Sequence, residues 1–192
     1  MDETVWRSRA AALVEATLSK KRLAHSREVA SVACELCDRF RWDGDKGYIA
    51  GIAHDLAREK TPAELLSLCE GDGAPISDLE RESPILLHGR ASALLLAQCT
   101  GYEDPEVLQA IADHVTGRGS MGILSRILFA ADFLEPTREF VSPEFRRRTR
   151  DLPLDAMVLA VLERKLYYVR AEGRTAVPQS IALYEELKEH AG

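Results

Sequence analysis

Apolar positions recur along most of the chain at intervals of three and four residues, the spacing of one face of an amphipathic helix. We find no convincing run of alternating apolar and polar residues bounded by hairpin turns. The pattern therefore predicts an all-α fold. The expected helices run from Glu3 to Ser19, Arg22 to Phe40, Asp45 to Arg58, Pro62 to Glu70, Pro84 to Cys99, Pro105 to His114, Met121 to Glu135, Pro143 to Arg150, Leu154 to Glu172 and Gln179 to His190.

Short polar residues followed directly by proline mark the expected starts of four helices. The polar side chain accepts from backbone N–H groups that lack a partner, and proline loses nothing at the first helical position. These pairs are Thr61-Pro62, Ser83-Pro84, Asp104-Pro105 and Ser142-Pro143. Gly101 and Gly173 fall just past helix ends, where a left-handed residue is expected. Residues 71–78 and 116–120 are expected to form loops.

Composition narrows the class of protein. A chain of 192 residues with 46% apolar and 29% charged residues is typical of one soluble globular domain, here residues 1–192. Neither a targeting segment nor an apolar run of membrane-spanning length is visible, so we expect a cytoplasmic protein that does not contact a membrane. The net charge of −6 argues against a dedicated nucleic-acid binder. Four cysteines suit a reducing compartment and are expected to be thiols.

Four of the five histidines and two aspartates fall on the inward faces of five predicted helices. They are His25, His54, Asp55, His88, His114 and Asp132. A single histidine on an apolar face is usually a core residue with its hydrogen bonds satisfied. Six such groups are costly to bury without partners, and a cation that takes them as ligands would offset that cost. Nitrogen and oxygen donors without a thiolate favour iron, manganese, cobalt or nickel, with zinc as a further option.

The order of these six residues resembles the HD-domain superfamily of metal-dependent phosphohydrolases. Within it, the segments Leu86–Gly89, His114–Arg118 and Ala131–Arg138 are similar to the YqeK-like branch of symmetrical bis(5′-nucleosyl)-tetraphosphatases. The resemblance implies an HD-domain helical bundle and an acid-anhydride hydrolase that cleaves diadenosine tetraphosphate into two ADP. It also implies two metal ions, commonly iron, with a metal-bound hydroxide as the attacking group.

By the same resemblance, Asp55 would bridge the two ions. His25, His54 and Asp132 would complete one metal site, and His88 and His114 the other. Arg58 follows the His-Asp doublet where many members carry lysine, and we expect it to act in catalysis with Asp55 and to bind substrate. The other expected substrate contacts are His88, Thr116, Gly117, Arg118 and Arg138.

Two further functions stay open at this stage. The chain could be an HD phosphohydrolase acting on a nucleoside monophosphate, a deoxynucleoside triphosphate or a signalling nucleotide. It could also be a non-catalytic sensor of a nucleotide or a metal. The oligomeric state is open, with a homodimer among the options. We expect packing roles for Trp42, Tyr167 and Tyr168, a structural role for the Cys34–Cys37 pair, and a solvated helix face for Arg146–Arg148.

Overall fold

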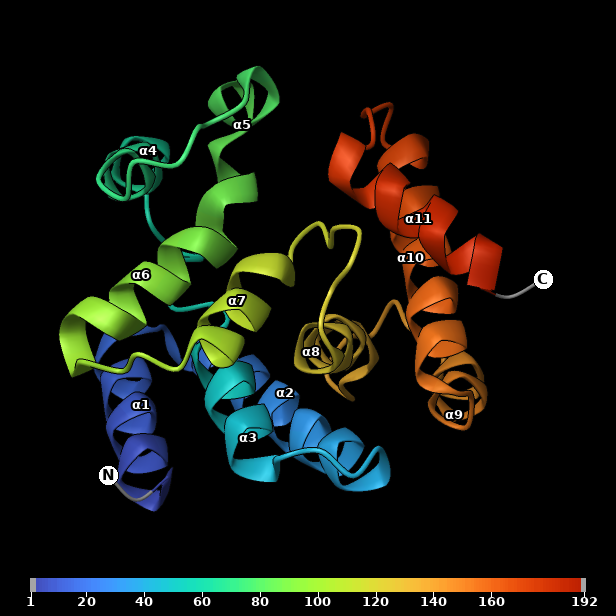
Figure 1. Ribbon diagram of the computed structural model, residues 1–192, viewed down its shortest axis with the longest axis horizontal. Helices are drawn as coiled ribbons and strands as arrows, with labels where there is room; N and C mark the ends of the chain where they lie inside the picture. The colour runs from blue at the N-terminus through green and yellow to red at the C-terminus, as the bar shows by residue number, and fades with distance from the viewer. Residues whose placement is uncertain (1–2, 191–192) are drawn as a thin grey trace.

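The computed structural model describes residues 3–190, and all regular secondary structure in this range is helical. The predicted all-α fold is confirmed (Figure 1). Its elements are α1 (Glu3–Thr17), α2 (Lys20–Arg39), α3 (Gly44–Ala53), α4 (Pro62–Glu70), α5 (Asp78–Glu82), the 3₁₀ helix η1 (Pro84–Leu87), α6 (His88–Thr100), α7 (Pro105–Asp113), α8 (Ile123–Leu134), α9 (Pro143–Arg150), α10 (Leu154–Ala171) and α11 (Pro178–His190).

Helices α2, α3, α7 and α8 form the centre of the bundle. Helix α8 is apolar almost all round, which fits a helix with neighbours on every side, and it packs against α2, α3, α7 and α10. In Figure 1 it lies between α7 and the pair α10 and α11. On the other side of the molecule, α4, η1 and α6 share a small apolar cluster of their own around Leu65, Cys69 and Leu87.

Three of the four predicted helix caps are confirmed. Thr61 and Glu64 form a capping box, and the side chains of Asp104 and Ser142 accept from backbone N–H groups of α7 and α9. At Ser83 a helical segment does begin with Pro84, as the 3₁₀ helix η1, but the predicted side-chain cap was wrong, because the Ser83 side chain accepts from no backbone N–H group of η1. Ser83 instead ends the short helix α5, which the sequence did not predict. Its backbone N–H donates to the carbonyl of Leu79.

Two predicted helices differ from the structure, one in its length and one in its continuity. The helix expected from Asp45 to Arg58 ends at Ala53, and the chain continues in tight turns in which Arg58 N–H donates to the Asp55 carbonyl at 2.8 Å. The helix expected from Pro84 to Cys99 is divided at His88, where η1 gives way to α6. Both changes occur at a histidine of the predicted metal set.

Helices α2 and α3 approach each other closely at Gly51. A Cβ atom at this position would lie 2.5 Å from the Cα atom of Ala30 in α2. Such a distance is shorter than van der Waals contact, so any side chain at Gly51 would force the two backbones apart. The glycine therefore sets the separation of the helices that carry His25 and His54.

Several smaller expectations are settled. Cys34 and Cys37 are free thiols, and burial raises the pKa of Cys37 to about 12. Tyr168 packs against the core, whereas the packing role expected for Tyr167 was wrong, because its ring is 62% exposed on the outer face of α10. Arg146 is not solvated as expected, because its guanidinium donates to the carbonyls of Leu134 and Arg138.

Trp42 is also more exposed than expected, and its indole N–H donates to Glu106. Within residues 3–190, no helix has the length and apolar character needed to cross a membrane.

The Gly51 contact gives a stability prediction. We expect Gly51→Ala to lower the free energy of unfolding by about 1–3 kcal/mol, because the steric cost exceeds the gain of about 1 kcal/mol in helix propensity. Urea unfolding followed by circular dichroism measures this. Gly44→Ala is the matched control in the same helix, since its Cβ would meet nothing closer than 3.4 Å. Equal stability of the two variants would contradict the assignment of Gly51 as a contact position.

Candidate metal centre

The structure brings the six residues of the predicted metal set to one place. They come from α2, the end of α3, the start of α6, the end of α7, and α8. All six are buried, with Asp55 only 3% and His54 0% exposed. Helix faces showed only that these side chains point inward, and the crossing of the five helices makes them converge.

The carboxylate of Asp55 lies at the middle of the cluster, and its two oxygens face different histidines. Oδ2 is 3.5 Å from Nε2 of His54 and 3.6 Å from Nε2 of His25. These two Nε2 atoms are 3.3 Å apart. Asp132 completes this side, because its Oδ1 is 3.1 Å from His25 Nε2 and 3.5 Å from His54 Nε2.

The other oxygen of Asp55 faces the remaining pair of histidines. Oδ1 is 3.2 Å from Nε2 of His88 and 3.8 Å from Nε2 of His114. Two groups of three ligand atoms, each closer than 4.8 Å to one another, therefore share Asp55 and could each hold a metal ion. A carboxylate between two such groups has the arrangement of a bridging ligand.

Three of the histidines are oriented by the same local device. Nδ1 of His54, His88 and His114 donates to the carbonyl of the residue three positions earlier, at 2.7, 2.5 and 2.7 Å. Each histidine stands at the end of a helical segment, where its ring lies close to a carbonyl of the preceding turn. Because a carbonyl can only accept, Nδ1 must carry the proton, which leaves the lone pair of Nε2 for a metal ion.

His25 lies in the middle of α2 and uses a carboxylate instead. Its Nδ1 is 3.1 Å from Oε1 of Glu135, a fully buried residue just after α8 that also accepts from the backbone and hydroxyl of Thr137. The sequence predicted Glu135 as the last residue of the helix that carries Asp132 and gave it no role. The hydrogen bond to Glu135 orients the His25 ring so that Nε2 faces the cluster.

The cluster is electrostatically coupled. Burial opposes ionisation of Asp55 and Asp132, yet the charge of His54 holds the pKa of Asp55, and that of Arg138 the pKa of Asp132, well below the usual range. Burial also opposes the charged form of His54, but the two aspartates raise its pKa to about 10. Burial lowers the pKa of His114 to about 4. The buried carboxylates thus require positive charge beside them, which a proton or a metal ion supplies.

The expected phosphate-binding arginines differ in their surroundings. Arg58 is half-buried, and we find no ion pair or hydrogen bond for its guanidinium among residues 3–190. Burial lowers the pKa of Arg58, and the charge of Asp55 acts in the opposite direction. Arg138 instead pairs with the carboxylate of Asp132. Arg58 is therefore the arginine of this pair that is available to an anion.

The loop after α7 is tied back to its own helix. Arg118 donates to Asp113 at 2.9 Å, and the Gly117 N–H donates to the Asp113 carbonyl at 2.8 Å. The Thr116 hydroxyl donates to the Gly117 carbonyl. A Cβ at Gly117 would also lie 2.5 Å from Leu183. These contacts show how the loop is held against the rest of the protein. Within residues 3–190, none of them joins Arg118 to the histidines of the cluster.

Two cationic side chains near the cluster were missed. Arg22 forms an ion pair with Oδ2 of Asp55 at 2.7 Å. Lys165 of α10 donates to the carbonyl of His114 at 3.2 Å, and burial lowers the pKa of its ammonium to about 8. Both partners are distant in sequence, so helix periodicity gave no signal for either contact.

With this geometry established, comparison with known proteins assigns the class. The model of the HD domain family matches residues 22–163, so the chain belongs to the HD-domain family, whose hydrolases are metal-dependent. Two relatives are named symmetrical bis(5′-nucleosyl)-tetraphosphatase. The one from Halalkalibacterium halodurans is 30% identical over 181 residues, covering 94% of this chain and 96% of its own. That from Bacillus subtilis is 28% identical over 181 residues, covering 94% and 97%.

A solved structure is equally similar. The crystal structure of a predicted HD superfamily hydrolase involved in NAD metabolism from Clostridium acetobutylicum matches with a TM-score of 0.90. It is 29% identical and the match covers 95% of this chain and 97% of that one. The HD-domain resemblance and the helical-bundle fold inferred from the sequence are therefore confirmed.

The hydrogen bond between His25 and Glu135 gives a test of the site. We expect Glu135→Gln to weaken metal affinity about 10- to 100-fold, because the neutral amide no longer holds the His25 ring with a carboxylate. Chelator competition on the metal-loaded protein measures the affinity. Glu139→Gln, an exposed change in the same segment, is the matched control. Equal metal affinity in the two variants would exclude an orienting role for Glu135.

Proposed function

We propose that this protein hydrolyses dinucleoside tetraphosphates symmetrically, releasing two nucleoside diphosphates at a centre that binds two metal ions. The named activity of the two relatives, each similar over nearly its whole length, supports the substrate class. Diadenosine tetraphosphate is the proposed substrate, and two ADP molecules are the proposed products.

The observation that carries the proposal is the division of the cluster by Asp55. One oxygen faces His25 and His54, and the other faces His88 and His114. We propose that the first pair, with Asp132, binds one ion and the second pair binds the other. This donor set fits borderline and hard cations, and we propose iron, with manganese, cobalt or nickel as alternatives.

When bound, two such ions would supply Lewis acidity for the phosphoryl oxygens and lower the pKa of a shared water. The residues of the chain have separate tasks. The carbonyls that accept from Nδ1 of His54, His88 and His114 hold the imidazole rings in place. The rings are therefore ordered before the reaction, and the entropic cost of ordering them is already met. Asp55 is proposed to hold both sites at one spacing.

The cationic side chains around the cluster suit a polyphosphate. We propose that Arg58 binds a phosphate oxygen, because its guanidinium is partly desolvated and has no carboxylate partner in the described chain. Arg138 would be released toward substrate once Asp132 binds a cation, since the two groups now share one ion pair. The leaving group is a nucleoside diphosphate, which is acidic enough to depart without a strong general acid.

Product analysis tests the substrate assignment. Metal-loaded protein is expected to convert diadenosine tetraphosphate into ADP alone, because attack at the middle of the chain yields two equal halves. Ion-exchange chromatography of the products measures this. Equal amounts of AMP and ATP would contradict symmetrical cleavage. A strong preference for a mononucleotide in a substrate panel would contradict the proposed substrate class.

Removal of one histidine tests the metal centre. We expect His54→Ala to lose metal and to lower kcat/KM by more than about 100-fold, since a direct ligand matters more than its orienting partner. Elemental analysis and steady-state kinetics give the two readouts, with circular dichroism to verify folding. His190→Ala is the control, because this histidine is 56% exposed. A folded His54→Ala protein with normal activity would refute the centre.

A further inference from the structure

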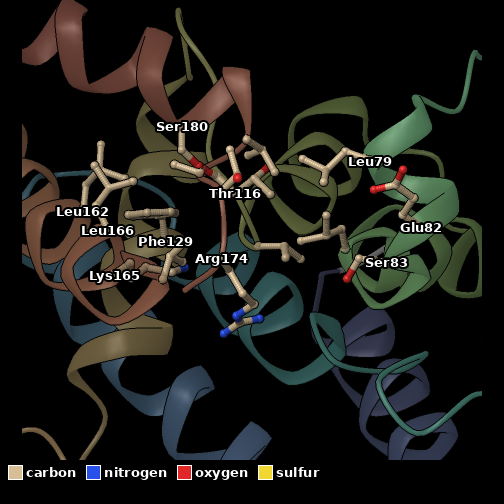
Figure 2. Close-up of a pocket in the computed structure, with 16 residues that line it drawn as sticks. Leu79, Glu82, Ser83, Thr116, Phe129, Leu162, Lys165, Leu166, Arg174 and Ser180 are labelled. Atoms are coloured by element: carbon tan, nitrogen blue, oxygen red, sulfur yellow. The ribbon is translucent and has the colours of Figure 1, made fainter. Parts of the chain in front are cut away.

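A cavity of about 330 Å³ opens between two parts of the bundle that are distant in sequence (Figure 2). One wall comes from α5 and η1, with Leu79, Glu82 and Ser83. The opposite wall comes from α8 and α10, with Phe129 and Lys165. Most of the remaining lining is aliphatic, from Leu86, Val115, Leu162, Leu166, Val169 and Val177.

This cavity adjoins the metal centre through chain connectivity and through a direct contact. Leu86 precedes His88 by two residues, and Val115 and Thr116 directly follow His114. Lys165 lines the cavity and donates to the carbonyl of His114. An occupant of the cavity would therefore lie within reach of groups bound at the centre.

Lys165 is the cationic group at the junction of the two spaces. Its Nζ lies 4.1 Å from the centroid of the Phe129 ring, and its charge interacts with Asp132 and Asp55 of the centre. We find no carboxylate within ion-pair distance of Lys165 among residues 3–190. An ammonium whose partners are only a carbonyl and an aromatic face retains donors for an anion.

The other cationic residue in the lining, Arg174, differs from Lys165. Arg174 pairs with Glu172, and its side chain is 59% exposed. Its charge is therefore largely satisfied and screened by solvent. Lys165 is the cation in this wall that a phosphate could bind without breaking an ion pair.

We propose that the cavity holds one nucleoside of the substrate and that Lys165 binds the phosphate joining that nucleoside to the metal centre. The inference rests on the proposed function and adds a substrate-binding residue to it. Apolar, largely aliphatic walls suit a nucleobase, whereas an ammonium at the inner end suits the phosphate. The volume is at the lower end of the range of about 300–1,000 Å³ for ligand pockets, so it fits one nucleoside and not both.

Binding of ADP and of adenosine to the metal-loaded protein separates the two parts of this proposal. We expect Lys165→Met to lower ADP affinity about 10- to 100-fold, the range for one hydrogen bond to a charged group, with adenosine affinity unchanged. Methionine keeps the apolar stem against Phe129. KM for diadenosine tetraphosphate should rise with kcat little changed, and Lys165→Arg should restore part of the loss.

A second variant tests the cavity itself. Val169→Trp places a large ring in the apolar wall and is expected to weaken ADP and adenosine alike. Lys188→Met is the charge-matched control for Lys165→Met, because Lys188 is exposed on α11 and does not line the cavity. Circular dichroism verifies that each variant folds. Unchanged affinity for both ligands in a folded Val169→Trp protein would overturn the assignment of the cavity.

The remaining outcomes separate this inference from the proposed function. Normal ADP affinity in Lys165→Met, with symmetrical hydrolysis intact, would overturn the role of Lys165 and leave the proposed function standing. Loss of metal from Lys165→Met would also overturn the proposed phosphate-binding role of Lys165, because the lysine would then act through His114. Failure of the metal-loaded wild-type protein to release ADP from diadenosine tetraphosphate would instead contradict the proposed function.

Discussion

The buried carboxylate of Asp55 is the group on which the arrangement of the bundle depends. It is 3% exposed and stands within 4 Å of Nε2 atoms from four histidines carried by four different helices. Removing an ionised carboxylate from water costs several kcal/mol unless charges and hydrogen bonds replace the water. Helices α2, α3, α6 and α7 must therefore end or cross where their imidazoles can reach it, and small shifts of any one would leave the charge unsatisfied.

Gly51 connects that requirement to the backbone. Its missing side chain lets α3 approach Ala30 of α2, and its carbonyl accepts the Nδ1 proton of His54. The same close approach brings the Nε2 atoms of His25 and His54 to 3.3 Å. The end of α3 at Ala53 also helps to assemble the cluster. The tight turns that follow place Asp55 toward the neighbouring helices, whereas a continued helix would carry it around the α3 axis. The departure from the predicted helix is thus a condition for the site.

Helical periodicity was sufficient for the fold class and for the inward direction of the six residues, because both depend on neighbours three or four positions away. Convergence was not predictable in this way, since it depends on how helices cross. Arg22, Glu135 and Lys165 escaped for the same reason: their partners lie 33, 110 and 51 residues away. Arg118 was predicted to bind substrate because a glycine-flanked arginine resembles a phosphate-binding loop, and its hydrogen bond to Asp113, five residues earlier, could not be read from that pattern.

Local charge decides how a protein of net charge −6 can attract a polyphosphate. Around the centre, the cations Arg22, Arg58, Arg138 and Lys165 stand against the carboxylates of Asp55, Asp132 and Glu135. Two bound metal ions would add several positive charges to a region that is already near balance, and a low-dielectric setting would strengthen their field. Positive potential would then be concentrated at the site, although the net charge of the chain is −6. A negative net charge is therefore compatible with a small, highly charged anionic substrate.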